Sequence, residues 1–248
     1  EADYKALWER RNDKTENPAR PWVITDRRNG RQQYVYLANF DWYNYLYDDS
    51  RPTWDHNINI KGGTKALSYM VSGRYYQQKG VNRLEPDMFR SYNFRVKLQA
   101  EIKPWLTIAS NTKFFQSNYK YYGYEDEYNN FRKPTLHALA SFVPVNPDGT
   151  AVSHTSMTQS STHYVMDGYN AMMQKGKSFG NKKTQEITTT FEATFKLHKN
   201  FNIKADFSYT QGYLHNDYRS VNVQYSQYPG EVMTEPEGSF PNKYKEVV

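Results

Sequence analysis

Hydrophobic and polar residues alternate strictly along several long segments of the chain. Between Tyr92 and Ile102, every even position is apolar and every odd position is polar. Because successive side chains of a β-strand point to opposite faces, this segment predicts a strand with one apolar face and one polar face. It is about twice as long as a typical strand of a globular protein. A strand of this kind suits a position with lipid on one face and water on the other.

The same alternation recurs in other segments and predicts six strands in all. Four of them fall within residues 56–115, and two form a hairpin within residues 184–211. The hairpins close in short turns, one of which is marked by Gly62-Gly63. The connection over residues 116–183 is very long by comparison. Outer-membrane barrels combine short periplasmic turns with long extracellular loops in this way.

The sequence therefore predicts an all-β fold that is a fragment of a large antiparallel transmembrane β-barrel with long extracellular loops. Six strands cannot close a membrane barrel, for which about eight strands are the minimum. An open apolar sheet would leave unpaired backbone groups in lipid, at a high cost in free energy. If the short turns are periplasmic, residues 1–55 form an extracellular loop that follows a missing first strand. Residues 116–183 and 212–248 are expected to be extracellular loops as well.

Composition narrows the class of membrane protein. Among the 248 residues are 23 Tyr, 13 Phe and 5 Trp. The mean hydropathy is −0.95, and no apolar run approaches the about 20 residues that a transmembrane helix needs. A helical membrane protein is therefore excluded. A β-barrel is not, because alternation halves the apparent hydropathy of each span.

Charge and reactive residues give no sign of enzymatic or nucleic-acid chemistry. The formal net charge is +6, but the basic residues form no dense stripe beyond Arg10-Arg11 and Arg27-Arg28. We therefore expect no nucleic-acid binding. The absence of cysteine excludes disulfides and thiolate sites. The six histidines lack metal-ligand spacing and no Gly-x-Ser-x-Gly motif occurs, so we predict no catalytic residue, no metal, no cofactor and no enzyme.

Several short motifs, in this order, resemble a known family. Residues 40–43 (FDWY) are followed by residues 56–64 (HNINIKGGT) and 78–81 (QKGV), and residues 144–150 (PVNPDGT) come later in the long connection. Together they resemble the start of the barrel in SusC/RagA-type TonB-dependent outer-membrane transporters. The likeness covers most of residues 40–210.

The resemblance implies a 22-stranded barrel in the bacterial outer membrane, with an N-terminal plug and a SusD-like surface lipoprotein as its cap. It implies import of a nutrient, an oligosaccharide or alternatively a peptide, energised by the TonB complex. The plug, the TonB box and the lipoprotein lie outside this sequence. A dimer of transporter–lipoprotein complexes is left open.

Three sets of residues are candidates for contacts. Aromatic faces can stack on sugar rings and their hydroxyls can bond to a ligand, although contact with the lipoprotein or an interfacial aromatic belt are alternatives. This first set opens the long connection and comprises Tyr119, Tyr121, Tyr122, Tyr124 and Tyr128. The second set is expected to face the lumen and comprises Arg74, Arg95, Lys97, Gln99 and Glu101. The third set is expected to contact membrane lipid and comprises Phe94, Leu98, Phe191 and Phe207.

Two other classes of protein share the alternating pattern. A soluble β-sandwich or surface carbohydrate-binding protein has period-two strands as well, but strand length and loop asymmetry disfavour it. A passive porin or an adhesin barrel would have the same strands without a plug.

Overall fold

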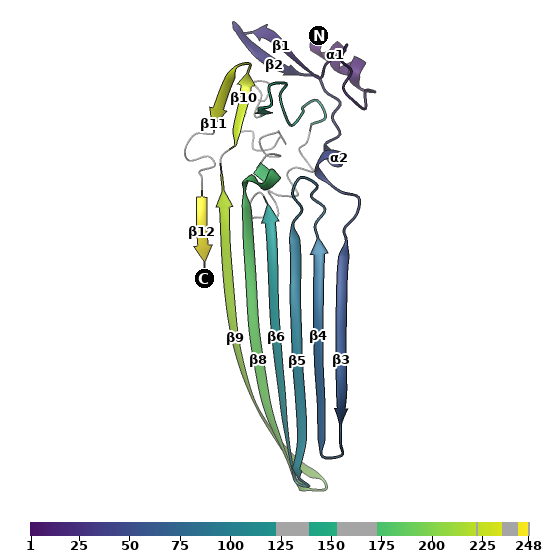
Figure 1. Ribbon diagram of the computed structural model, residues 1–248, viewed down its shortest axis with the longest axis vertical. Helices are drawn as coiled ribbons and strands as arrows, with labels where there is room; N and C mark the ends of the chain where they lie inside the picture. Colours follow the sequence, from purple (N-terminus) through teal and green to yellow (C-terminus); the bar gives the residue numbers. More distant parts are fainter. Residues whose placement is uncertain (123–138, 153–172, 222, 235–242, 248) are drawn as a thin grey trace.

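The computed structural model describes residues 1–122, 139–152, 173–221, 223–234 and 243–247. A long sheet of seven strands forms the body of the molecule, and shorter elements lie beyond one end of it (Figure 1). We call these elements the end module. It comprises residues 1–52, 139–152 and 223–234.

All neighbouring strands of the long sheet are antiparallel, in the order β12-β9-β8-β6-β5-β4-β3. Its strands are β3 (Thr53–Gly63), β4 (Leu67–Lys79), β5 (Met88–Lys103), β6 (Leu106–Tyr122), β8 (Phe179–His198), β9 (Phe201–Ser220) and β12 (Lys243–Val247). The prediction of an all-β, antiparallel fold is confirmed. The short turns between β3 and β4, β5 and β6, and β8 and β9 lie at the end of the sheet opposite the end module, whereas the longer β4–β5 connection lies beside the module (Figure 1).

Several strands extend further toward the end module than the sequence pattern indicated. β6 continues to Tyr122 and β8 begins at Phe179, and these two residues pair with each other. Residues 116–122 and 179–183, which the sequence assigned to a loop, are therefore paired strand. β9 likewise continues to Ser220. Both faces of these strand ends carry tyrosines and polar residues, so the alternation that predicts a strand fades there.

The end module contains short helices and hairpins within segments that the sequence assigned to extracellular loops. Its elements are α1 (Ala2–Arg10), β1 (Val23–Arg28), β2 (Arg31–Tyr36), α2 (Trp42–Leu46), β7 (Ala151–Val152), β10 (Gln224–Tyr228) and β11 (Glu231–Thr234). A further irregular turn, η2 (Met173–Lys177), precedes β8. The hairpin of β1 and β2 turns at Asn29 and Gly30, whose φ angles are 52° and 78°. Two residues with positive φ give the turn type that matches the twist of a hairpin.

The buried apolar core lies in the end module and not in the long sheet. Its members include Trp22, Tyr34, Tyr36, Trp42, Leu46, Phe142 and Val152. The ring centroids of Tyr36 and Phe142 are 5.4 Å apart, and the backbone N–H of Ala38 donates to the carbonyl of Ser141 at 3.1 Å. Contacts between such distant parts of the sequence hold the module together.

A turn over residues 144–150 links the module's hairpins. Gly149 adopts a φ of 86°, which side-chain-bearing residues rarely adopt. Tyr36 Oη donates to Asn146 Oδ1 at 2.8 Å, and Asn146 Nδ2 donates to the carbonyl of Ser226 at 3.1 Å. The side chain of Asn146 thereby joins β2 to β10.

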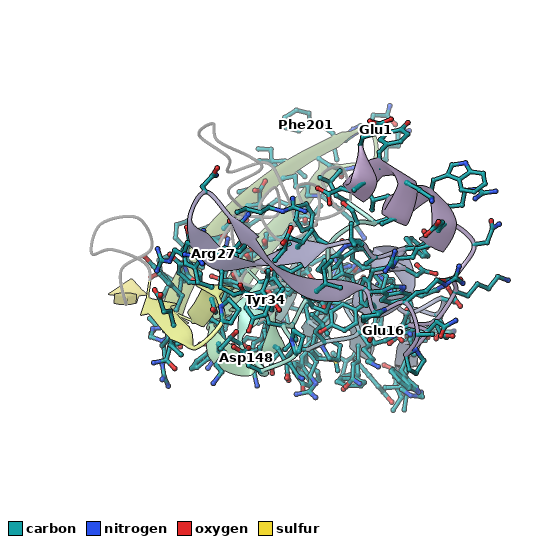
Figure 2. The ribbon with its side chains drawn as sticks, turned by 90° about the horizontal axis from the view of Figure 1, so that it is seen from above. Glu1, Glu16, Arg27, Tyr34, Asp148 and Phe201 are labelled. Carbon is teal, nitrogen blue, oxygen red and sulfur yellow. The ribbon has the colours of Figure 1, made fainter. Side chains whose placement is uncertain are left out.

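The same turn places Asp148 beside Tyr34 (Figure 2). Tyr34 Oη donates to Asp148 Oδ2 at 2.7 Å. Burial, together with this carboxylate, raises the pKa of Tyr34 to about 12. Burial also acts to raise the pKa of Asp148, but hydrogen bonds from Thr150 and Tyr34 outweigh it and lower that pKa. The pair is most stable as a neutral phenol beside an ionised carboxylate.

None of the helices in the described part of the chain is long and apolar enough to cross a membrane.

Candidate functional site

The long sheet has one apolar face. Residues that pair directly across antiparallel strands share a face, and the registers from β3 to β9 shift only beside the hairpin turns of β5 and β8. The large side chains on this face include Ile58, Ile60, Tyr69, Phe94, Leu98, Phe114, Ile187, Phe191 and Phe207. Phe191 and Phe207 pair directly and are 54% and 66% exposed. Phe94 and Leu98 are exposed on the same face.

Aromatic side chains border the apolar face at both ends. On the side of the end module, the rings of Tyr75 and Tyr92 are 5.2 Å apart between centroids, and His56 stacks on Tyr75 at 6.4 Å. At the hairpin end, Trp105 stacks on Phe195 at 6.4 Å. Along β5 the apolar band runs from Tyr92 to Ile102, which is about 34 Å of extended strand.

The opposite face of the sheet is polar and internally hydrogen-bonded. Nε and Nη2 of Arg74 donate to the two carboxylate oxygens of Asp55 at 2.8 and 2.6 Å. Arg95 Nε donates to Asn111 Oδ1 at 2.8 Å. The residues that the sequence assigned to a lumen all lie on this face and are Arg74, Arg95, Lys97, Gln99 and Glu101. A hollow of about 260 Å³ lies over this face, between Arg74, Arg95, Lys113 and Glu186.

A larger cleft of about 880 Å³ lies where the polar face meets the end module. It is bounded by the ends of β4, β5, β6 and β8 and by the connection between β4 and β5. Its aromatic lining residues are Tyr47, Phe89, Tyr119, Tyr121 and Tyr122. Three of the five tyrosines predicted for substrate or partner contact therefore border one cleft, although they lie on strand β6 and not in a loop.

Tyr119 and Tyr121 form an aromatic pair inside the cleft. Their ring centroids are 5.6 Å apart and the rings are nearly parallel. Tyr119 Oη donates to Asp87 Oδ2 at 3.2 Å. Tyr121 is only 5% exposed and its ring lies against the backbone of Gly180. The pair is therefore held in place from two sides.

The other predicted tyrosines differ in position. Tyr122 borders the cleft, but its side chain lies on the same face of the sheet as that of Lys120, opposite to Tyr119 and Tyr121. Nζ of Lys120 is 5.1 Å from the centroid of the Tyr122 ring. Tyr124 and Tyr128 lie outside the described residues.

The cleft carries charges of both signs. Its basic side chains are Arg51 and Lys182, and its acidic side chains are Glu85 and Asp87. Arg51 Nη2 donates to Gln78 Oε1 at 2.8 Å. Sequence reasoning did not single out these four charges. Only Lys182 could have been found from the strand pattern: it pairs with Tyr119 across β6 and β8, and paired residues share a face.

An ion-paired carboxylate fixes the connection that closes the cleft. Asp48 accepts from Arg83 at 2.8 Å and lies 3.7 Å from Lys79 Nζ. Two backbone hydrogen bonds of 2.7 Å, from Asp48 to Val81 and from Arg83 to Leu46, run beside it. These contacts join the end of α2 to the segment after β4, so the cleft is bounded by ordered chain.

No cluster of acidic or histidine side chains suited to a metal ion occurs among the residues with described positions.

Comparison with known proteins relates the fold to large importers. No family model matches the chain, and no curated protein matches it. A chain of the RagAB peptide importer in its closed-closed state is 18% identical with a TM-score of 0.57, and the likeness covers 75% of this chain and 20% of that one. The open-open state gives 19% identity, a TM-score of 0.57 and coverages of 76% and 20%. At this identity the likeness concerns the fold alone, and this chain spans about a fifth of the length of those chains.

Proposed function

We propose that this chain is part of the barrel of a bacterial outer-membrane transporter that imports a nutrient. The observation that carries the proposal is the exposed apolar face opposite a polar, hydrogen-bonded face. Strands tilted by 35–45° would convert about 34 Å of strand into a band about 24–28 Å tall, which agrees with the about 25 Å apolar band of outer-membrane barrels. The aromatic borders of this band fit the two membrane interfaces.

A soluble β-sandwich would bury such a face against a second sheet. Within the described chain, the two smaller sheets belong to the end module. Large side chains of the apolar face, such as those of Ile58, Phe94 and Phe207, are thus exposed, as lipid contact requires. The polar face would line a lumen that contains a plug, and the charges there would contact the plug or water.

Energised import, as opposed to passive diffusion, is supported by the likeness to the RagAB peptide importer. The partners we propose are therefore the TonB complex, acting through parts outside this chain, and a SusD-like lipoprotein. The end module lies at the extracellular end in this arrangement. Its exposed aromatic residues, among them Trp8 and Tyr43, are suited to contact the lipoprotein. The transporter itself would not be an enzyme.

The cleft is the proposed contact site for cargo at the mouth of the lumen. Its four charges of both signs favour a peptide, since a peptide carries an ammonium and a carboxylate group at its ends. The Tyr119–Tyr121 pair favours an oligosaccharide as a second candidate, because aromatic faces stack on sugar rings.

Uptake by the full-length protein in its host bacterium tests the proposal. We expect that deletion of the gene abolishes growth on short peptides as the sole nitrogen source, and that deletion of TonB has the same effect. Growth that persists without TonB would identify a passive porin instead. Growth lost only on oligosaccharides would assign the cleft to glycans. A full-length protein that stays folded and monomeric in water without detergent would contradict membrane insertion altogether.

A further inference from the structure

Three basic residues cluster on the apolar face just beyond its aromatic border. In the sheet, Arg90 pairs with Asn118 and Asn118 pairs with Lys183, so these three side chains form one row. Lys120 lies on the same face, two residues further along β6. This row lies two residues along each strand from the row that contains Tyr75 and Tyr92, on the side of the end module. We call Arg90, Lys120 and Lys183 the basic cluster.

The spacing of the basic cluster suits one small anion. Neighbouring strands lie about 4.8 Å apart, so the Cα atoms of Arg90 and Lys183 are about 10 Å apart on either side of β6. Lys120 lies about 7 Å beyond Asn118 on the central strand. Three long side chains from the corners of such a triangle can reach a common centre, close to Asn118, which lies midway between Arg90 and Lys183.

Among the residues with described positions, no ion pair neutralises these charges. Arg90 Nε donates to the neutral Gln77 Oε1 at 3.1 Å, and Lys120 lies over the Tyr122 ring. Within the described part of the chain, no carboxylate forms an ion pair with any member of the basic cluster. Arg90 and Lys120 are exposed, and Lys183 is half-buried.

The position of the cluster matches that of a lipid head group. A bilayer has a hydrocarbon core of about 30 Å within a total thickness of about 40–45 Å, which leaves about 5–8 Å of head group on each side. One residue pair beyond the aromatic border is about 7 Å along a tilted strand, or about 5 Å in height. On this measure the Cα atoms of Arg90 and Lys183 lie about 5 Å and that of Lys120 about 10 Å beyond the border, so that long side chains from all three can reach head-group depth on the side of the end module.

We infer that the basic cluster binds the phosphate of an anionic lipid in the outer leaflet. Arginine can bind two phosphate oxygens at once, and the two lysines add point charges. The inference rests on the proposed membrane location, but it concerns lipid and not cargo. A bound lipid phosphate would help to fix the orientation of the barrel in the bilayer, at the membrane surface beside the end module.

The test uses the full-length protein, purified in neutral detergent, with its thermal unfolding midpoint as the readout. The probes are lipid A, lipid A stripped of its phosphates, and inorganic phosphate. We expect lipid A to raise the midpoint of the wild type. The triple variant Arg90→Gln, Lys120→Gln, Lys183→Gln should need about tenfold more lipid A for the same rise, since each lost charged hydrogen bond weakens binding. Stripped lipid and inorganic phosphate at equal concentration should have little effect.

Two further variants make the outcome decisive. The triple variant Lys5→Gln, Lys14→Gln, Arg27→Gln removes the same charge from exposed positions of the end module and should respond like the wild type. The double variant Lys120→Arg, Lys183→Arg keeps the charge and should retain the response even if the glutamine variant folds poorly.

Three results would overturn the inference: an unchanged lipid A response in the glutamine variant, a lost response in the arginine variant, or an equal effect of stripped lipid or free phosphate. Failure of the wild type to enter the outer membrane would instead contradict the proposed function. The two failures are therefore distinguishable.

Discussion

The ring of Tyr121 lies against the backbone of Gly180, the residue that pairs with it across β6 and β8. A methyl group on Gly180 would overlap this ring. The absence of a side chain at residue 180 thus allows Tyr121 to lie flat on the sheet and to stack on Tyr119 within the cleft.

We predict that Gly180→Ala displaces Tyr121 and destabilises the protein by about 1–3 kcal/mol, the usual cost of overpacking. Thermal unfolding of the full-length protein in detergent measures the effect. Gly212→Ala is the matched control, because a methyl group there would make only ordinary contact. Adding Tyr121→Ala to Gly180→Ala removes the overlap and should recover part of the loss. Equal midpoints for the two single alanine variants would contradict this account of the cleft.

A charge on the apolar face should impede membrane insertion. Phe207 lies in the row of Leu98 and Phe191, midway along the apolar band. Phe207→Arg should cost about 2–4 kcal/mol, as expected for arginine near the bilayer midplane. The amount of heat-modifiable protein in the outer membrane reports on insertion. Ser208→Arg, on the polar face, should insert nearly normally; if both variants insert equally well, the assignment of the faces is wrong.

The charges of the cleft should select cargo by sign. Arg51→Gln combined with Lys182→Gln should weaken uptake of acidic peptides about tenfold, the loss expected when a charged hydrogen bond is removed. Glu85→Gln should act on basic peptides instead. Competition with labelled peptides in whole cells measures both effects, with the exposed Lys14→Gln as control. Equal losses for acidic and basic peptides in both variants would exclude a direct role of these charges.

Tyr34 should give the end module an alkaline limit of stability. The pKa of Tyr34 is raised to about 12 in the folded protein, whereas tyrosine in an unfolded chain titrates near 10. Because the folded-state pKa is the higher one, this contribution to stability is complete below about pH 10 and is lost as the pH rises through about 12. Phenolate absorbance should therefore show a late-titrating tyrosine that Tyr34→Phe removes and that Tyr4→Phe, at an exposed position, leaves in place. Burial also raises the pKa of Tyr45, so the late step should shrink in Tyr34→Phe; a late step of unchanged amplitude would contradict this.

The sequence predicted the strands best where the two faces of the sheet differ most. Between Tyr92 and Ile102, every residue obeys the alternation, and the structure continues it in both neighbouring strands. Residues 116–122 do not show this alternation. They are strand, but tyrosines, a lysine and small polar residues occupy both faces there, so the period-two pattern is lost although the pairing is not.

The structure of the end module could not be predicted from the sequence pattern, for another reason. Its core joins Tyr36 to Phe142 and, through Asn146, to Ser226. Such contacts between distant segments leave no local periodicity. The charges of the cleft were missed for the same reason, because Arg51, Asp87 and Lys182 come together only when the strands pair.

The most direct test of the membrane assignment is the accessibility of β5 to lipid. The chain has no cysteine. Single cysteines can therefore be introduced at successive positions, from Phe94→Cys to Gln99→Cys, and no native cysteine of the chain would be labelled as well. A fluorophore attached to each would be measured in the full-length protein, reconstituted with and without brominated lipid, which quenches only what it touches. We predict strong quenching at residues 94, 96 and 98 and little at residues 95, 97 and 99. Quenching that is absent, or that shows no period of two along the strand, would contradict a barrel wall with lipid on its apolar face.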